Sequence, residues 1–125
     1  MSAHTHALVV HCIDFRLQKY LDPWLLERFG YDHFDRVSLA GGVFDFYAVL
    51  RQIEISDRLH HIKKVVLINH EDCGAYGQED SYARHKADLE EAKRKIEALF
   101  PHLDVETYYL HLDGKFEPLS RTTRS

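Results

Sequence analysis

Short apolar runs alternate with longer amphipathic stretches along this chain. Residues 6–12, 35–39 and 64–69 are short and rich in Val, Leu and Ile, which is typical of buried β-strands. Longer stretches separate them, and in these stretches apolar residues recur at spacings of three and four, as on the buried face of a helix. This alternation predicts βα units around a parallel sheet.

Three helices are expected, over residues 17–29, 44–59 and 80–99. Pro23 falls inside the first stretch and indicates that the main helix starts there, and Gly30 ends it. The apolar positions expected to face the core from the second and third helices are Phe46, Val49, Leu50, Ile53, Leu59, Leu89, Ala92, Ile96 and Leu99.

The pattern changes after the third helix. Residues 104–112 alternate as in a strand, Asp113-Gly114 is a strong hairpin signal, and residues 115–119 form the returning strand. The polar tail from Ser120 is expected to be frayed. We expect one α/β domain over residues 1–125, because the length is that of a single core and no linker or repeat divides it.

Composition excludes several classes of function. The chain has 125 residues, 45% of them hydrophobic, and a formal net charge of −4, so it has no basic field for nucleic acid. Its longest apolar runs are too short to span a bilayer, and it does not start with a cationic signal region, so we expect a cytoplasmic protein with no membrane partner. In that compartment two cysteines are more often reduced thiols or metal ligands than a disulfide.

Both cysteines follow apolar runs, where strands are expected to end. Cys12 lies in His-Cys-Ile-Asp-Phe-Arg after the first strand, and Cys73 lies in His-Glu-Asp-Cys-Gly, which starts at His70, after the third. The carboxyl ends of parallel strands share one edge of the sheet, where functional crevices lie. Two thiolates and one imidazole suit Zn²⁺ better than magnesium or calcium and leave a fourth position open, so that bound water becomes hydroxide near neutral pH.

Asp14 and Arg16 follow Cys12 by two and four residues. An Asp held by Arg stays ionised and can accept a hydrogen bond from the hydroxide, which orients it toward a substrate carbon. Alternatively, Asp14 could move onto the metal as the fourth ligand if Arg16 released it. The pair could also be an ordinary structural ion pair, and the two cysteines could be buried core thiols.

Three motifs together resemble those of the β-class carbonic anhydrases. Cys-Ile-Asp-Phe-Arg at 12–16, Leu-Ala-Gly-Gly at 39–42 and His-Glu-Asp-Cys-Gly at 70–74 look like that family's Cys-x-Asp-x-Arg, Ala-Gly and His-x-x-Cys-Gly motifs, in the same order. The resemblance covers about residues 7–119. It implies zinc bound by Cys12, His70 and Cys73, with the Asp14–Arg16 pair beside it.

The resemblance also has consequences for the fold, the pocket and the assembly. It implies an α/β fold with a mostly parallel four-stranded sheet flanked by helices, an additional C-terminal strand, and a homodimer or higher homo-oligomer. Gly41, Gly42 and Gly74 are the glycines expected to let the backbone approach the pocket closely.

The chain departs from the family in two ways. The first strand starts near residue 6, so we expect the family's N-terminal helical arm to be absent. Ile13 and Phe15 flank Asp14, where family members usually have small or polar residues, and Phe15 could either narrow the pocket or face the core.

Three functions remain open from the sequence. The first is hydration of carbon dioxide to bicarbonate by a zinc-bound hydroxide. The second is zinc-dependent hydrolysis of a related small molecule such as carbonyl sulfide or carbon disulfide. The third is a catalytically silent zinc-binding protein that serves as a binding or regulatory module.

Overall fold

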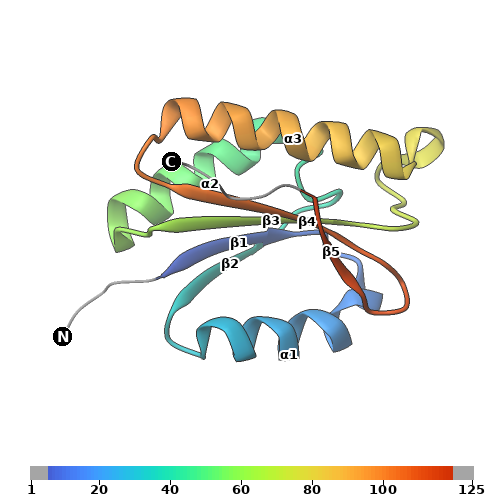
Figure 1. Ribbon diagram of the computed structural model, residues 1–125, viewed down its shortest axis with the longest axis horizontal. Helices are drawn as coiled ribbons and strands as arrows, with labels where there is room; N and C mark the ends of the chain where they lie inside the picture. The colour runs from blue at the N-terminus through green and yellow to red at the C-terminus, as the bar shows by residue number, and fades with distance from the viewer. Residues whose placement is uncertain (1–5, 120–125) are drawn as a thin grey trace.

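The computed structural model describes residues 6–119, and these form five strands in one sheet with the order β2-β1-β3-β4-β5. The first four strands run parallel, and β5 pairs antiparallel with β4 (Figure 1). This confirms the α/β fold with four parallel strands and one added C-terminal strand. The strands are β1 (Ala7–His11), β2 (Phe34–Ser38), β3 (Lys64–His70), β4 (Asp104–Leu110) and β5 (Phe116–Pro118).

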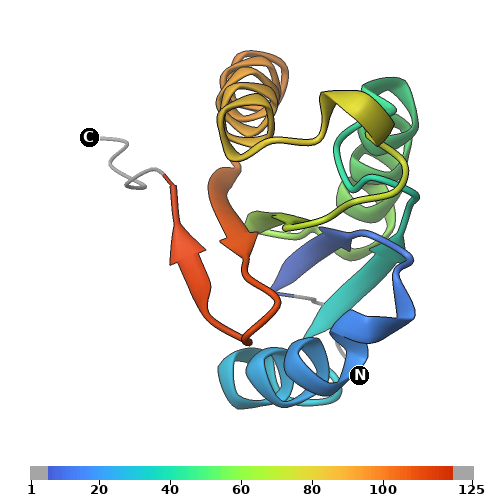
Figure 2. The same cartoon turned by 90° about the vertical axis from the view of Figure 1, so that its right-hand side faces the viewer.

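Helices cover both faces of the sheet. α1 lies on one face, and α2 and α3 lie together on the other (Figures 1 and 2). Within residues 6–119, no helix is both long enough and apolar enough to pass through a bilayer. The helices are α1 (Gln18–Phe29), α2 (Phe46–His60) and α3 (Tyr82–Leu99), with two short 3₁₀ turns, η1 (Phe15–Leu17) and η2 (Gly77–Glu79).

The helix starts differ from the predictions for identifiable reasons. α2 and α3 each begin two residues later than expected, because Asp45 and Ser81 serve as N-caps whose side chains accept backbone N–H groups. α1 starts at Gln18 and runs through Pro23, so the start predicted at Pro23 is wrong. Leu21 and Leu25, both buried, anchor this helix on either side of the proline.

The core consists of two apolar clusters, one on each face of the sheet. Leu8 and Val10 of β1 pack toward α2 and α3, and Val9 between them packs toward α1. All five residues of β1 are buried, as in a parallel strand covered on both faces. Two of the predicted core positions are wrong, because Leu59 and Leu99 are 54% and 61% exposed in the last turns of their helices.

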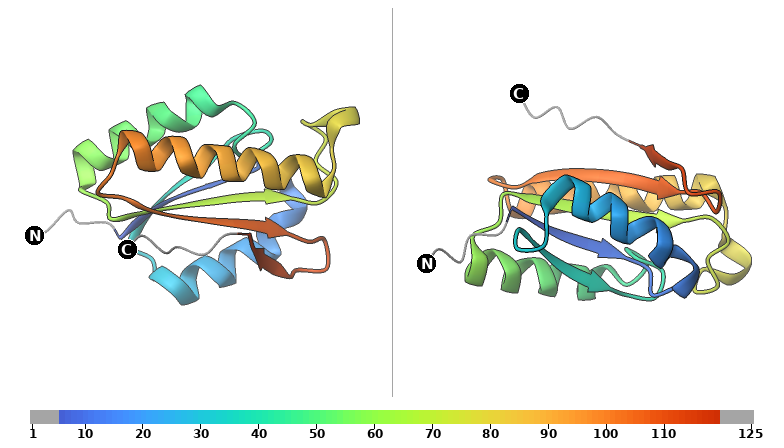
Figure 3. Two further views of the ribbon diagram at one scale, coloured as in Figure 1. Left: turned by 45° about the horizontal axis from the view of Figure 1, so that its top comes forward. Right: turned by 90° about the horizontal axis from the view of Figure 1, so that it is seen from below.

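One edge of the sheet gathers the connections that follow the parallel strands. β1, β2, β3 and β4 all point toward it (Figure 3). The segments 12–17, 39–45 and 71–81 therefore meet at this edge, and they carry the three sequence motifs. The opposite edge holds the amino ends of the strands.

Candidate metal centre

Cys12, His70 and Cys73 converge at the carboxyl edge of the sheet. Cys12 directly follows β1, and His70 is the last residue of β3, three residues before Cys73. The two Sγ atoms lie 4.0 Å apart, and the candidate ligand atoms of all three residues lie within 4.8 Å of one another. All three side chains are buried. The structure therefore brings together the ligands that the sequence analysis selected from two separate motifs.

The hydrogen bonds of His70 leave one ring nitrogen unused. Its Nδ1 lies 2.7 Å from the carbonyl oxygen of Glu71, which can only accept, so Nδ1 carries the proton. Nε2 then presents a lone pair, and it is buried with no hydrogen-bond partner among the described residues. A buried unpaired nitrogen is costly unless something binds it. Proteins usually orient a metal-binding histidine in this way, with the ring nitrogen that does not bind the metal donating a hydrogen bond to a carbonyl oxygen.

The two thiols differ in their electrostatic surroundings. Burial tends to raise the pKa of Cys12. Two interactions outweigh burial, one with the His70 side chain and one with the N–H group of Gly41, and they lower the pKa to about 7. The Gly41 nitrogen lies 3.3 Å from the Cys12 sulfur. Burial is the largest cause that raises the pKa of Cys73 to about 11, and the negative charge of Cys12 is the second. A divalent cation would favour both thiolates, so this donor set fits zinc.

Arg16 holds Asp14 beside the cluster. Its Nη2 and Nε donate to the Asp14 carboxylate at 2.7 and 3.1 Å, and its backbone N–H donates to the same carboxylate at 2.9 Å. These hydrogen bonds with Arg16 are the main reason why the pKa of Asp14 is lowered to about 2. Asp14 is therefore ionised at neutral pH, and its nearer oxygen lies 3.9 Å from Nε2 of His70.

Asp72 is a second partner of Arg16 that the sequence analysis missed. Arg16 donates to the Asp72 carboxylate at 3.1 Å and to its carbonyl oxygen at 2.9 Å. Asp72 has a φ of 60°, in the left-handed region, which among residues other than glycine is adopted most often by asparagine, aspartate and histidine. Arg16 thus ties the loop after β1 to the loop after β3.

The three predicted glycines differ in what the structure demands of them. Gly41 and Gly42 have φ values of +82° and +63°, and a Cβ on Gly42 would lie 2.4 Å from Oδ1 of Asn69. The fold therefore requires glycine at both positions, and the Gly41 N–H reaches the sulfur of Cys12. A Cβ on Gly74 would meet open space, so the backbone there does not require glycine. A role for Gly74 in the pocket remains a prediction.

A buried polar network underlies the two loops, and the sequence analysis did not find it. The Asn69 amide accepts the Val43 N–H at 3.2 Å, and its Nδ2 lies 3.0 Å from the Tyr76 hydroxyl and 2.8 Å from Nδ1 of His85. His85 is fully buried, and its Nε2 lies 2.7 Å from Asp80. The signal for this network was an asparagine at the end of an otherwise apolar strand.

Exposed and half-buried apolar side chains lie on the loops that carry the candidate ligands. Phe15 is 78% exposed, so it does not face the core, which settles one of the alternatives left open by the sequence. An open depression of about 580 Å³ flanks the Gly41 turn and the Cys73 loop. It is lined by Leu39, Ala40, Phe44, Asp45 and Ala75.

Comparison with known proteins identifies the family. Residues 2–120 match the protein family described as "Putative carbonic anhydrase". The chain belongs to this carbonic anhydrase family. It is 37% identical to an uncharacterized protein of Rickettsia conorii over 90% of this chain and 70% of that protein. It is 33% identical to an uncharacterized protein of Rickettsia bellii over 90% of this chain and 80% of that one.

Solved carbonic anhydrases share the fold. A β-carbonic anhydrase of Trichomonas vaginalis superposes with a TM-score of 0.76 at 13% identity, over 98% of this chain and 86% of that one. The carbonic anhydrase of Glaciozyma antarctica gives 0.70 at 16% identity, over 96% and 85%. One of two β-carbonic anhydrases of Sordaria macrospora described as tetrameric gives 0.60 at 16% identity, over 99% and 84%. Membership in this family is consistent with a metal site at Cys12, His70 and Cys73.

Proposed function

We propose that this protein binds one zinc ion through Cys12, His70 and Cys73 and catalyses the reversible hydration of carbon dioxide to bicarbonate. The observation that carries the proposal is the buried, unpartnered Nε2 of His70 next to two thiols, with an ionised carboxylate 3.9 Å away. Membership in the carbonic anhydrase family supports it.

A zinc ion held by these ligands supplies a Lewis acid that makes a water molecule nucleophilic near neutral pH. Asp14 is the residue that orients the nucleophile. Because it is ionised, it can only accept a hydrogen bond, and accepting one from the attacking oxygen turns a lone pair of that oxygen toward the substrate.

Arg16 positions Asp14 for this task. Its hydrogen bonds to both carboxylate oxygens fix the orientation of Asp14, and its bonds to Asp72 fix Arg16 in turn. These bonds engage both carboxylate oxygens of Asp14, which would have to lose them to become a metal ligand. An open fourth position, which a catalytic metal requires, would therefore depend on Arg16.

The neighbouring depression suits an apolar substrate. Leu39, Ala40, Phe44 and Ala75 give it a mainly hydrocarbon wall beside the Cys12 turn. Carbon dioxide has no net charge or dipole, so an apolar wall suits it better than a polar one. The candidate ligands and Asp14 do not line this depression themselves, but the Gly41 turn between them and Phe44 connects the two.

The test is stopped-flow hydration of carbon dioxide with protein whose zinc content has been measured. We expect hydration above the buffer rate, and a decrease of about 100-fold in kcat for Asp14→Asn with zinc still bound, because the amide no longer acts as an ionised acceptor. Asp32→Asn is the matched control, since Asp32 is exposed in the turn between α1 and β2.

Two results would contradict the proposal in different ways. If the fully zinc-loaded protein hydrates carbon dioxide no faster than buffer, the carbonic anhydrase function is refuted and a zinc-binding module remains. Turnover of carbonyl sulfide by the same sample would then indicate the alternative hydrolase. Full activity of Asp14→Asn would refute only the orienting role.

We also propose that the protein assembles as a homodimer or a larger homo-oligomer. Ile13, Phe15 and Tyr47 are 61%, 78% and 84% exposed, and removing such apolar area from water favours association. Light scattering should give a mass of at least twice that of one chain, and Phe15→Ser should shift the mass toward the monomer. A monomeric wild-type protein at micromolar concentration would refute this part.

A further inference from the structure

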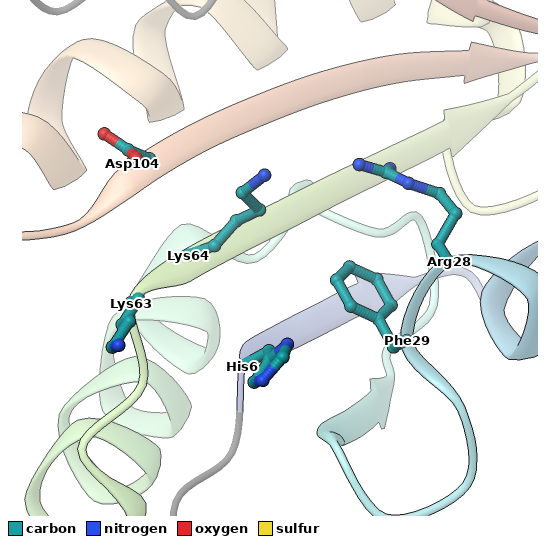
Figure 4. Close-up of a pocket in the computed structure, with 6 residues that line it drawn as sticks. All are labelled: His6, Arg28, Phe29, Lys63, Lys64 and Asp104. Carbon is teal, nitrogen blue, oxygen red and sulfur yellow. The ribbon is translucent and has the colours of Figure 1, made fainter.

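A second depression lies at the amino ends of the strands, on the opposite edge of the sheet from the metal centre. It has a volume of about 350 Å³, within the range of sites for small molecules. Residues from four separate stretches of the chain meet there (Figure 4). They are His6, Arg28, Phe29, Lys63, Lys64 and Asp104.

The cationic groups of this depression are held in place by a carboxylate. Glu106 of β4 accepts from Lys64 at 2.6 Å and from Arg28 at 2.9 Å. The Lys64, Arg28 and Glu106 side chains are 30%, 26% and 12% exposed, so this ion-pair network is largely shielded from solvent. Arg28 also lies over the rings of Trp24 and Phe29, which restricts its motion.

Donors remain available after these bonds are made. An ammonium has three N–H groups and a guanidinium has five. Glu106 accepts one from Lys64 and one from Arg28, and the Tyr108 hydroxyl accepts a second one from Arg28. Figure 4 shows the head groups of Lys64 and Arg28 extending toward each other, with Phe29 and His6 on the side of α1 and β1. Lys63 is the third cationic residue of the lining, and its side chain extends away from Lys64 and Arg28 in Figure 4.

The local charge balance favours an anion. Three cationic side chains outnumber the two carboxylates, Asp104 and Glu106, although the whole chain has a net charge of −4. A phosphate group suits such a site because it offers several charged acceptor oxygens to cationic donors that lie on different sides of it. The ring of Phe29 forms an apolar wall for the organic part of the ligand.

We infer that this depression is a binding site for the phosphate group of a small phosphate monoester, separate from the metal centre. Inorganic phosphate is the probe. In ¹H–¹⁵N spectra of the zinc-loaded full chain, saturable shifts with a Kd of about 1 mM are expected at the amides of Phe29, Lys63 and Lys64. The same concentrations of phosphate should leave the amides of the metal loops unchanged.

A variant series tests the cationic donors. Lys64→Gln should weaken phosphate binding about tenfold, because one charge-assisted hydrogen bond is lost. Lys64→Arg, which keeps the charge, should bind within about threefold of the wild type. Lys86→Ala removes an exposed lysine of α3 that pairs with Glu90 and is the control for a general loss of positive charge.

Three results would overturn the inference. One is the absence of saturable shifts up to 20-fold above the expected Kd, which would leave the Lys64–Glu106–Arg28 network as a structural link between α1 and the sheet. The second is a set of shifts confined to the metal loops, as expected for phosphate on the metal alone. The third is equal binding by Lys64→Gln and wild type. None of these readouts depends on carbon dioxide hydration, so failure of this inference is distinguishable from failure of the proposed function.

Discussion

Replacing Gly42 by alanine tests how tightly the turn after β2 is fixed against β3. A Cβ at position 42 would lie 2.4 Å from Oδ1 of Asn69 and 2.9 Å from the carbonyl oxygen of Ile68. The Asn69 amide cannot move aside freely, because it is hydrogen-bonded to Val43, Tyr76 and His85. Gly42→Ala must therefore either shift the turn or break part of a buried network.

The loss of stability caused by Gly42→Ala can be estimated by comparing alanine substitutions at three glycines. Alanine in the left-handed region costs about 1–2 kcal/mol, which is the full effect expected for Gly77→Ala, since Gly77 has a φ of +57° and open space around it. At Gly42 the broken buried hydrogen bonds add about 1–3 kcal/mol, giving about 2–5 kcal/mol in total. Gly74→Ala has neither cost and should change stability by less than about 0.5 kcal/mol.

Urea unfolding of the zinc-free proteins measures these differences, because omitting the metal removes stabilisation by binding. The expected order of destabilisation is Gly42, then Gly77, then Gly74. If Gly42→Ala lost no more stability than Gly77→Ala, the contact between this turn and Asn69 would not constrain the fold, and the argument would be refuted.

Three further predictions concern the metal ligands and the buried histidine. Cys12→Ser and Cys73→Ser should each reduce bound zinc to well below one per chain by atomic absorption, and unchanged zinc in both would rule out the ligand assignment. Between pH 8 and 9 the apparent zinc affinity should rise at least about tenfold, because metal binding must displace the proton of Cys73, whose pKa is about 11; a flat profile in a competition titration would contradict this. Burial lowers the pKa of His85 below 6.5, so in acid the unfolded chain binds a proton that the folded chain does not, and stability falls as the pH drops below about 6.5. His85→Gln should reduce that slope by up to about 1.4 kcal/mol per pH unit in urea unfolding, and an identical slope would show that His85 does not cause it.

The convergence of the three candidate metal ligands was predictable because their positions follow from local rules. Cys12 and His70 come at the ends of apolar runs, and parallel strands bring their carboxyl ends to one edge. Once the strands were recognised, the convergence of the two motifs required no information about side-chain packing. The antiparallel pairing of β5 with β4 agreed with the hairpin predicted at Asp113-Gly114.

Other features depend on tertiary contacts that no local pattern contains. The partnership of Arg16 with Asp72 joins residues 56 positions apart, and the left-handed backbone of Asp72 leaves no mark in the sequence. The continuation of α1 through Pro23 also depends on packing, because Leu21 and Leu25 are buried against the sheet. Local propensity alone predicted a helix start there.

The polar network around Asn69 links the predictable positions of the candidate ligands to tertiary contacts that the sequence did not reveal. Asn69 immediately precedes the ligand His70, and it holds the backbone of Val43, two residues after the glycine whose N–H reaches Cys12. A polar residue at this depth is costly unless its hydrogen bonds are satisfied, and His85 and Tyr76 satisfy them. Two of the candidate ligands, Cys12 and Cys73, lie on loops and His70 ends β3. A buried amide supported by α3 and the Tyr76 loop holds these segments together, as a preorganised metal site requires.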